Sequence, residues 1–77
     1  MKKFRLSFNT KDKEKDFDTI SNLENAIEKY YFGVVHFEET KTKYIIEFMD
    51  LFGDLTHLRT YLSRNKNIMS YNIEKLY

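Results

Sequence analysis

The fold is decided by residues 34–51, which read VVHFEETKTKYIIEFMDL. Two runs rich in β-branched and aromatic residues, 34–39 and 42–51, flank the polar centre ETKT, a pattern typical of two strands joined in a hairpin. The centre has no glycine and no Asn-Gly pair, which favours a four-residue loop over a tight two-residue turn. A register with Phe37 opposite Tyr44 places the large apolar side chains of both strands on one face.

Helical spacing precedes and follows this hairpin. A first stripe of apolar residues, three or four positions apart, consists of Phe17, Ile20, Leu23, Ile27, Tyr30 and Tyr31. We expect Asp16 or Asp18 to cap this helix and Gly33 to end it in a left-handed conformation. A second stripe consists of Leu55, Leu58, Tyr61 and Leu62. It predicts a helix capped by Asp54 that runs to about Arg64.

Both ends of the chain alternate between apolar and polar residues. Residues 3–9 place Phe4, Leu6 and Phe8 on one face, and residues 68–75 repeat the alternation, so each segment predicts a half-buried strand. Residues 10–16 carry alternating charges and nothing apolar, which indicates a solvated loop.

These elements predict a single α+β domain over residues 1–77. Their order is β-α-β-β-α-β, and right-handed crossovers place the first and third strands in the middle of the sheet. We therefore expect a ferredoxin-like sandwich, in which two helices cover one face of a four-stranded antiparallel sheet. The central strands then present six apolar residues to the helices: Phe4, Leu6, Phe8, Tyr44, Ile46 and Phe48.

Composition narrows the class of protein. The 13 basic and 12 acidic residues nearly balance, which argues against a general nucleic-acid binder and against an acidic DNA mimic. The absence of cysteine removes disulfides and thiolate chemistry, and no segment approaches the roughly 20 apolar residues of a membrane span. We expect a cytoplasmic protein. The abundance of Phe, Tyr, Ile, Asn and Lys is typical of AT-rich genomes, which include low-GC bacteria, their phages and their plasmids.

The sequence offers no recognisable catalytic, cofactor or metal site. The first loop has neither arginine nor glycine with which to cradle a phosphate group. His36 stands alone in its strand, whereas a metal-dependent nuclease of a related fold needs two histidines on one strand. An RNA-recognition surface would need aromatic rings on the uncovered face of the sheet, but Phe4, Tyr44 and Phe48 are expected on the covered face. We therefore expect a protein that is not an enzyme.

Two surfaces are candidates for binding another protein. On the uncovered sheet face, the predicted register gathers Val34, His36, Ile45, Glu47 and Met49, although a few apolar residues on an open face are also ordinary. On the second helix, His57 and Arg64 flank Tyr61 at spacings of four and three. Tyr61 is equally compatible with a place in the core.

The function expected from these features is that of a small non-enzymatic protein-binding module. Its sharpest form is a phage- or plasmid-encoded inhibitor of a host enzyme, such as a defence nuclease, as anti-CRISPR proteins are, or a replication protein. The alternative is a nucleic-acid-binding regulator that acts as a dimer. It would use the basic loop and rim residues Lys3, Arg5, Lys11, Lys13, Lys15, Lys41 and Lys43. A homodimer joined through the second or fourth strand is a third reading.

Overall fold

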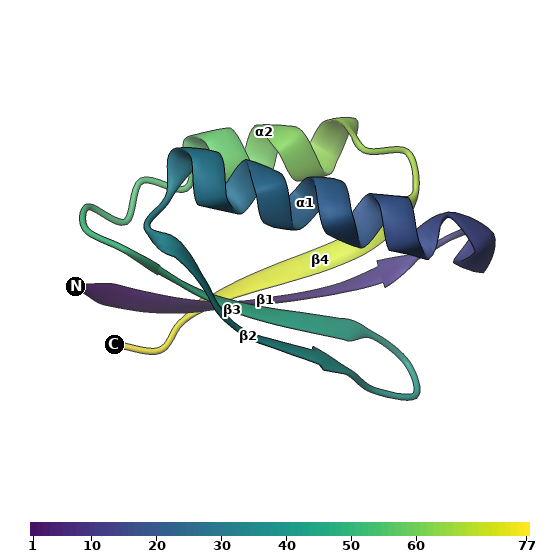
Figure 1. Cartoon of the computed structure of the whole chain (residues 1–77), viewed down its shortest axis with the longest axis horizontal. Helices are drawn as coiled ribbons and strands as arrows, with labels where there is room; N and C mark the ends of the chain where they lie inside the picture. Colours follow the sequence, from purple (N-terminus) through teal and green to yellow (C-terminus); the bar gives the residue numbers. More distant parts are fainter.

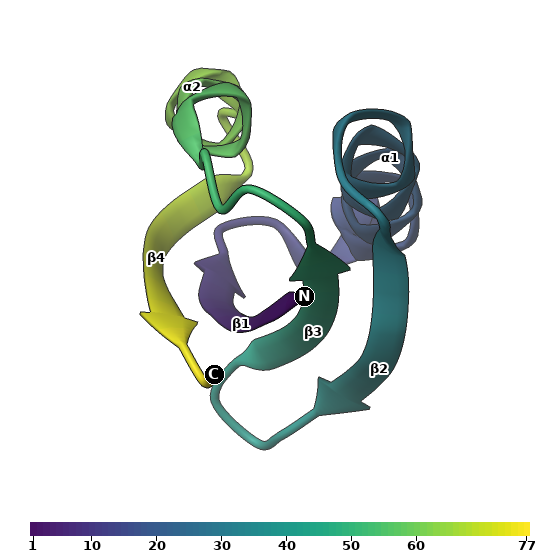
Figure 2. The same cartoon turned by 90° about the vertical axis from the view of Figure 1, so that its left-hand side faces the viewer.

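The protein is an α+β sandwich of one sheet and one layer of helices. The computed structural model describes residues 1–77. The elements in chain order are β1 (Lys2–Thr10), a 3₁₀ turn η1 (Lys13–Lys15), α1 (Asp16–Tyr30), β2 (Gly33–Glu39), β3 (Tyr44–Asp50), α2 (Thr56–Arg64) and β4 (Ile68–Lys75). The sheet has four strands in the order β2-β3-β1-β4, and every neighbouring pair is antiparallel. Both helices lie on the same face of this sheet, α1 above β2 and α2 above β4 (Figures 1 and 2).

The core lies where the central strands face the helices. Phe4 is paired with Phe48, Leu6 with Ile46 and Phe8 with Tyr44, and all six side chains are buried. The helices close this layer from above with four buried apolar residues, Leu23, Ile27, Leu58 and Leu62. Each such side chain contributes about 1.5–3 kcal/mol when it leaves water, so these residues fix the two-layer arrangement. The expected set of core residues on β1 and β3 is confirmed.

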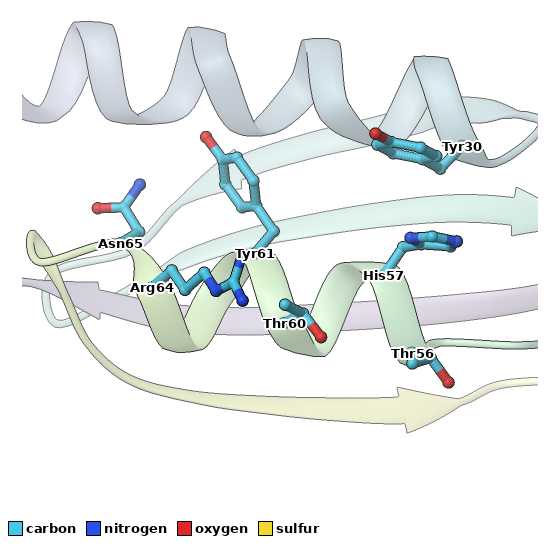
Figure 3. Close-up of a pocket in the computed structure, with 7 residues that line it drawn as sticks. All are labelled: Tyr30, Thr56, His57, Thr60, Tyr61, Arg64 and Asn65. Carbon is cyan, nitrogen blue, oxygen red and sulfur yellow. The ribbon is translucent and has the colours of Figure 1, made fainter.

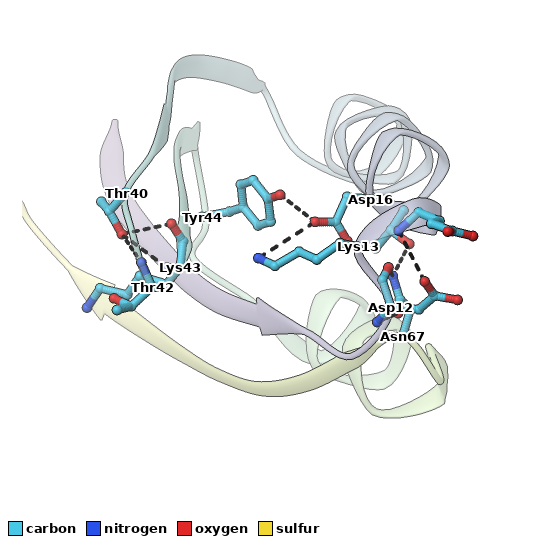
Figure 4. Close-up of polar contacts among 10 residues, drawn as sticks. Asp12, Lys13, Asp16, Thr40, Thr42, Lys43, Tyr44 and Asn67 are labelled. Atoms are coloured by element: carbon cyan, nitrogen blue, oxygen red, sulfur yellow. Dashed lines mark hydrogen bonds and ion pairs between the residues drawn. The ribbon is translucent and has the colours of Figure 1, made fainter.

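The hairpin loop consists of residues 40–43, which confirms the expected loop length, but it closes one residue later than expected. The hydroxyl of Thr40 donates to the carbonyl of Lys43 at 2.9 Å and accepts from the amides of Lys43 and Thr42 at 3.0 and 3.3 Å (Figure 4). This hydroxyl fixes the turn through bonds to nearby backbone groups. Phe37 therefore lies opposite Ile46, and the predicted pairing of Phe37 with Tyr44 is wrong.

A bulge in β2 changes which face its first residues occupy. Pairing shifts between Val34 and His36, so that Val34 lies opposite Phe48 and packs against the core. Val35 is left in the bulge with 53% of its surface exposed. The prediction that Val34 lies on the uncovered sheet face is therefore wrong, because a strictly alternating strand does not include this extra residue.

The ends of the helices also differ from the predicted caps. Neither Asp16 nor Asp18 caps α1: the helix continues from η1, and its N-cap residue, Lys15, makes no side-chain capping bond. Gly33 is the first residue of β2, two residues beyond the extended Tyr31 that ends α1. For α2, the N-cap residue is Leu55, which makes no side-chain capping bond, and Asp54 before it accepts a hydrogen bond from the amide of Thr56 at 3.0 Å. The helix ends at Arg64 as expected.

Candidate protein-binding surface

The surface with the most exposed apolar side chains beside a hollow lies where α1 overhangs the edge strand β2. We call it the α1–β2 surface and define it by Phe17, Ile20, Glu24, Val35, Phe37 and Glu39. Phe17 is 82% exposed and Phe37 is 40% exposed, although both are large and apolar. Together with Ile20 they line a hollow of about 370 Å³, which Tyr44 and Asp16 close from the side of the sheet.

Phe17 is exposed because its neighbour takes the buried position. The expectation that Phe17 belongs to the core stripe of the helix is wrong: Asp16 is only 7% exposed, and its carboxylate accepts a hydrogen bond from the hydroxyl of Tyr44 (Figure 4). Successive residues of a helix point about 100° apart. Once Asp16 faces the sheet, Phe17 must point outward.

The Asp16–Tyr44 pair is held by charge as well as by packing. Burial raises the pKa of Asp16, but the hydrogen bond from Tyr44, the side chain of Thr10, the charge of Lys13 and the side chain of Asn67 together outweigh burial, so this pKa lies below its ordinary value. The same hydrogen bond and burial raise the pKa of Tyr44 to about 12. Lys13 completes the group, with its Nζ atom 4.0 Å from the Asp16 carboxylate and 5.2 Å from the centre of the Tyr44 ring. The start of α1 is therefore fixed over Tyr44, the first residue of β3.

The rim of the hollow is acidic. Glu24 on α1 and Glu39 on β2 line it together with Asp16, and no lysine, arginine or histidine does. Glu38, which precedes Glu39 in β2, is exposed, and its carboxylate lies 3.4 Å from the ring of His36. Both side chains lie on the other face of the strand. An apolar hollow with acidic walls suits an apolar side chain flanked by positive charges.

The uncovered sheet face carries ion pairs at its centre. Glu47 is 12% exposed at its side chain, and it binds Lys3 at 3.3 Å and Arg5 at 3.0 Å. Arg5 also reaches Glu74 at 3.5 Å. The hydrogen bond from Arg5 lowers the pKa of Glu47, and burial raises it. Because Lys3 and the charge of Arg5 lower it further, this pKa lies below its ordinary value. Of the residues predicted for this face, Ile45 and Met49 are half-buried and His36 is exposed.

The predicted strip on α2 borders a second hollow, between the two helices. His57, Tyr61 and Arg64 line this hollow of about 520 Å³ together with Tyr30 of α1 (Figure 3). The rings of Tyr30 and His57 stack, with centroids 4.8 Å apart and planes 7° apart. Tyr61 points up between the helices and packs against the core, as one of the two alternatives predicted, and its role in binding stays a prediction.

The basic residues proposed for nucleic-acid binding occupy several different settings. Lys3 and Arg5 belong to the ion pairs of the uncovered face, and Lys13 is bound to Asp16. Lys11 and Lys15 line a hollow of about 300 Å³ with Lys66. Lys41 lies in the hairpin loop, and Lys43 lines a separate hollow with residues of β1 and β4.

Sequence reasoning did not single out Phe17, Phe37 or Val35 for binding. A further exposed group, Phe32, Leu51 and Phe52, lies in the two loops at the end of the molecule that holds both termini (Figure 1). Phe52 is 82% exposed, as Phe17 is. The sequence carried one signal for this second group, because Phe32 and Phe52 fall just outside the helical and strand patterns, whereas Leu51 was expected within the strand.

The chain was compared with protein-family models, with curated proteins and with solved structures, and none of them matches it. Neither helix has the length and apolar character needed to cross a membrane. No three His, Asp or Glu side chains lie where they could hold a metal ion together.

Proposed function

We propose that this chain is a non-catalytic protein-binding module and that the α1–β2 surface is its working surface. The order of the elements and the strand order β2-β3-β1-β4, with both helices on one face, support a ferredoxin-like arrangement. In this arrangement the sheet is a rigid platform, and its edge and the helix above it are free to meet a partner. The scaffold holds the binding side chains, and no chemical step is required of them.

The observation that carries the proposal is the 82% exposure of Phe17 beside the partly exposed Phe37 and a hollow. Aromatic side chains set beside a pocket dominate the energetics of protein interfaces, because their burial removes a large apolar area from water. The other exposed group, around Phe52, lines none of the hollows of the molecule. We therefore place the interface on the α1–β2 side.

The size of the chain supports an inhibitor that acts by covering its target. Its whole accessible surface is 5220 Å². A standard interface buries about 800 Å² on each partner, so a single partner would cover a sizeable part of one side. We propose that the partner is a host enzyme in the cytoplasm, such as a defence nuclease or a replication protein, and that the chain comes from a phage or plasmid. The compositional bias towards AT-rich codons supports this origin.

The test compares two variants whose altered residues are equally exposed. Wild-type protein, Phe17→Ser and Phe52→Ser are immobilised, and nuclease-treated lysate of a low-GC bacterium is passed over each. We expect one protein to be retained by wild type and by Phe52→Ser and to be lost from Phe17→Ser. Retention that depends on Phe52 and not on Phe17, or a protein retained from untreated lysate but not from nuclease-treated lysate, would contradict the proposal.

One observation favours the alternative of a nucleic-acid-binding regulator: Lys11, Lys15 and Lys66 line a common hollow. Binding through these charges should weaken steeply between 50 and 200 mM salt, by roughly tenfold for each few phosphate contacts, because it releases counterions. Light scattering at several protein concentrations would show whether the chain forms the dimer that this alternative requires.

A further inference from the structure

We propose that the partner adds an extended, positively charged segment to the free edge of β2, where it becomes a fifth strand of the sheet. This inference rests on the proposed function and names the kind of segment that the α1–β2 surface accepts. It follows from three properties of that edge: the direction of its backbone groups, the hollow beside it and the sign of the surrounding charges.

The backbone of β2 presents unused hydrogen-bonding groups at two alternate residues. β2 is the outermost strand, and residues 36–39 pair regularly with β3. The amide of Thr40 donates to the carbonyl of Lys43 at 2.8 Å. Along an antiparallel pair of strands, every second residue bonds to the partner strand. Because Thr40 bonds to Lys43, Glu38 also points its backbone groups towards β3, and Phe37 and Glu39 point theirs outward. The outward N–H and C=O groups of these two residues form a short template for another strand.

The bulge limits this template to the second half of β2. Bulges twist an edge and interrupt pairing, and they are one means by which proteins protect edge strands. Here the bulge lies at Val35, and residues 36–39 beyond it are regular and exposed. The added strand would therefore pair at Phe37 and Glu39 and pass over the exposed side chain of Val35.

The side chains beside the edge determine what the added strand carries. An apolar residue of that strand, turned towards the helix layer, enters the hollow between Phe17, Ile20 and Phe37. Glu24 and Glu39 then face the residues two positions before and after it, which point to the same side. Glu38 faces the residues directly before and after it, which point to the other face of the sheet. Opposite charges across neighbouring strands are favourable by about 0.2–1 kcal/mol for each pair, and like charges are unfavourable. The segment that fits therefore has one apolar residue with basic residues on either side of it, both at the adjacent positions and two positions away.

The same charges disfavour a second copy of this chain as the occupant. Pairing one β2 edge with another would place two sets of Glu24, Glu38 and Glu39 in one interface. The other free edge, β4, carries Glu74 and Lys75, which cancel each other, and offers no run of basic residues. The charge of the surface therefore points to a different protein that supplies lysine or arginine.

Two labelled heptapeptides test this inference, one with a central valine between two runs of three lysines and one with a central valine between two runs of three glutamates. Fluorescence anisotropy should show binding of the lysine peptide and at least about tenfold weaker binding of the glutamate peptide, because attraction is replaced by repulsion. Glu39→Lys should weaken binding of the lysine peptide by about tenfold on the same grounds. The control Glu14→Lys changes the net charge equally at an exposed site in η1 and should leave binding within about twofold.

Amide hydrogen exchange then distinguishes an added strand from general attraction. Binding of the lysine peptide should slow exchange at Phe37 and Glu39, whose amides are free, and leave the already bonded amide of Glu38 nearly unchanged. Equal binding of both peptides, or unchanged exchange at Phe37 and Glu39, would overturn the inference. If capture of a partner still depended on Phe17 in that case, the proposed function would stand and only the added strand would be wrong.

Discussion

Replacement of Tyr44 by phenylalanine tests the group that fixes the start of α1 and thereby exposes Phe17. The substitution removes the hydrogen bond from the Tyr44 hydroxyl to the buried Asp16 carboxylate and leaves the ring in place. The other oxygen of that carboxylate is buried without a hydrogen-bond partner, so the carboxylate keeps only weaker neighbours, Lys13 at 4.0 Å and the side chains of Thr10 and Asn67. A hydrogen bond to a charged group contributes about 1.5–3 kcal/mol.

The raised pKa of Tyr44 sets an upper bound on the same magnitude, because burial and the charges of Asp16 and Glu39 also contribute to it. Each tenfold change in acidity corresponds to about 1.36 kcal/mol. A pKa raised from 10.0 to about 12 therefore corresponds to ~2.7 kcal/mol. We expect Tyr44→Phe to lower the free energy of unfolding by about 2 kcal/mol, a large part of the ~4–12 kcal/mol available to a domain of this size. The melting temperature should fall by about 10 °C.

Urea denaturation followed by circular dichroism measures this loss, and Tyr71→Phe is the matched control because the Tyr71 hydroxyl forms no hydrogen bond. Tyr71→Phe should change the stability by less than about 0.5 kcal/mol, as is usual away from such features. If Tyr44→Phe behaved in the same way, the role assigned to this pair in holding α1 would be refuted.

The pH dependence follows from the direction of the two pKa changes. The pKa of Asp16 is lowered by folding, so its contribution to stability is complete above its ordinary value of 3.8 and is lost as the pH falls through the folded value. The pKa of Tyr44 is raised, so its contribution is complete below pH 10.0 and is lost as the pH rises towards about 12. The stability difference between wild type and Tyr44→Phe should therefore be constant from about pH 5 to 9 and shrink on both sides.

Two further substitutions test other parts of the fold. Tyr31→Phe removes the hydroxyl that accepts a hydrogen bond from the amide of Leu58 at 3.1 Å near the start of α2. Urea denaturation should show a free energy of unfolding lower by about 1–2 kcal/mol, because a buried amide is left unpaired. An unchanged midpoint would contradict this assignment. Glu47→Gln breaks the ion pairs with Lys3 and Arg5 on the uncovered sheet face. It should lower the free energy of unfolding by about 1 kcal/mol at pH 7. Because the pKa of Glu47 is lowered from 4.5, this loss of stability should vanish as the pH falls well below that value. A loss that persisted at pH 3 would show that the ion pairs are not its cause.

The sequence predicted the layers of this protein because their residues repeat with a clear period. Phe4, Leu6 and Phe8 alternate along one strand, and Leu23 and Ile27 lie one helical turn apart. Such local patterns report which face of an element is apolar, and the apolar faces can be buried in few ways. The α+β class and the position of the core could therefore be read before the structure was known.

The register of the hairpin and the face of Val34 depended on interactions that no period reveals. The hydroxyl of Thr40 moved the loop by one residue, and one additional residue in β2 turned Val34 towards the core. Both effects are small in energy and local in extent. The moved loop changes only which residues lie opposite each other and leaves Phe37, Tyr44 and Ile46 on one face, whereas the additional residue turns Val34 to the other face.

The α1–β2 surface could not be predicted because it depends on a contact between distant residues. Asp16 bonds to Tyr44, 28 positions along the chain, and this bond places a carboxylate where the apolar stripe of the helix predicted Phe17. The ion pairs of Glu47 with Lys3 and Arg5 join residues more than 40 positions apart, and they place charge at the centre of the sheet face where the sequence predicted an apolar patch.

The proposed partner covers the edge of β2 and the start of α1. Residue-by-residue amide exchange of the protein bound to its captured partner tests this claim most directly. We expect slowed exchange at Phe37 and Glu39, with no change at Tyr71 and Ile73, whose amides point outward on the opposite edge of the sheet. Slowed exchange confined to β4, or to the loop around Phe52, would contradict it.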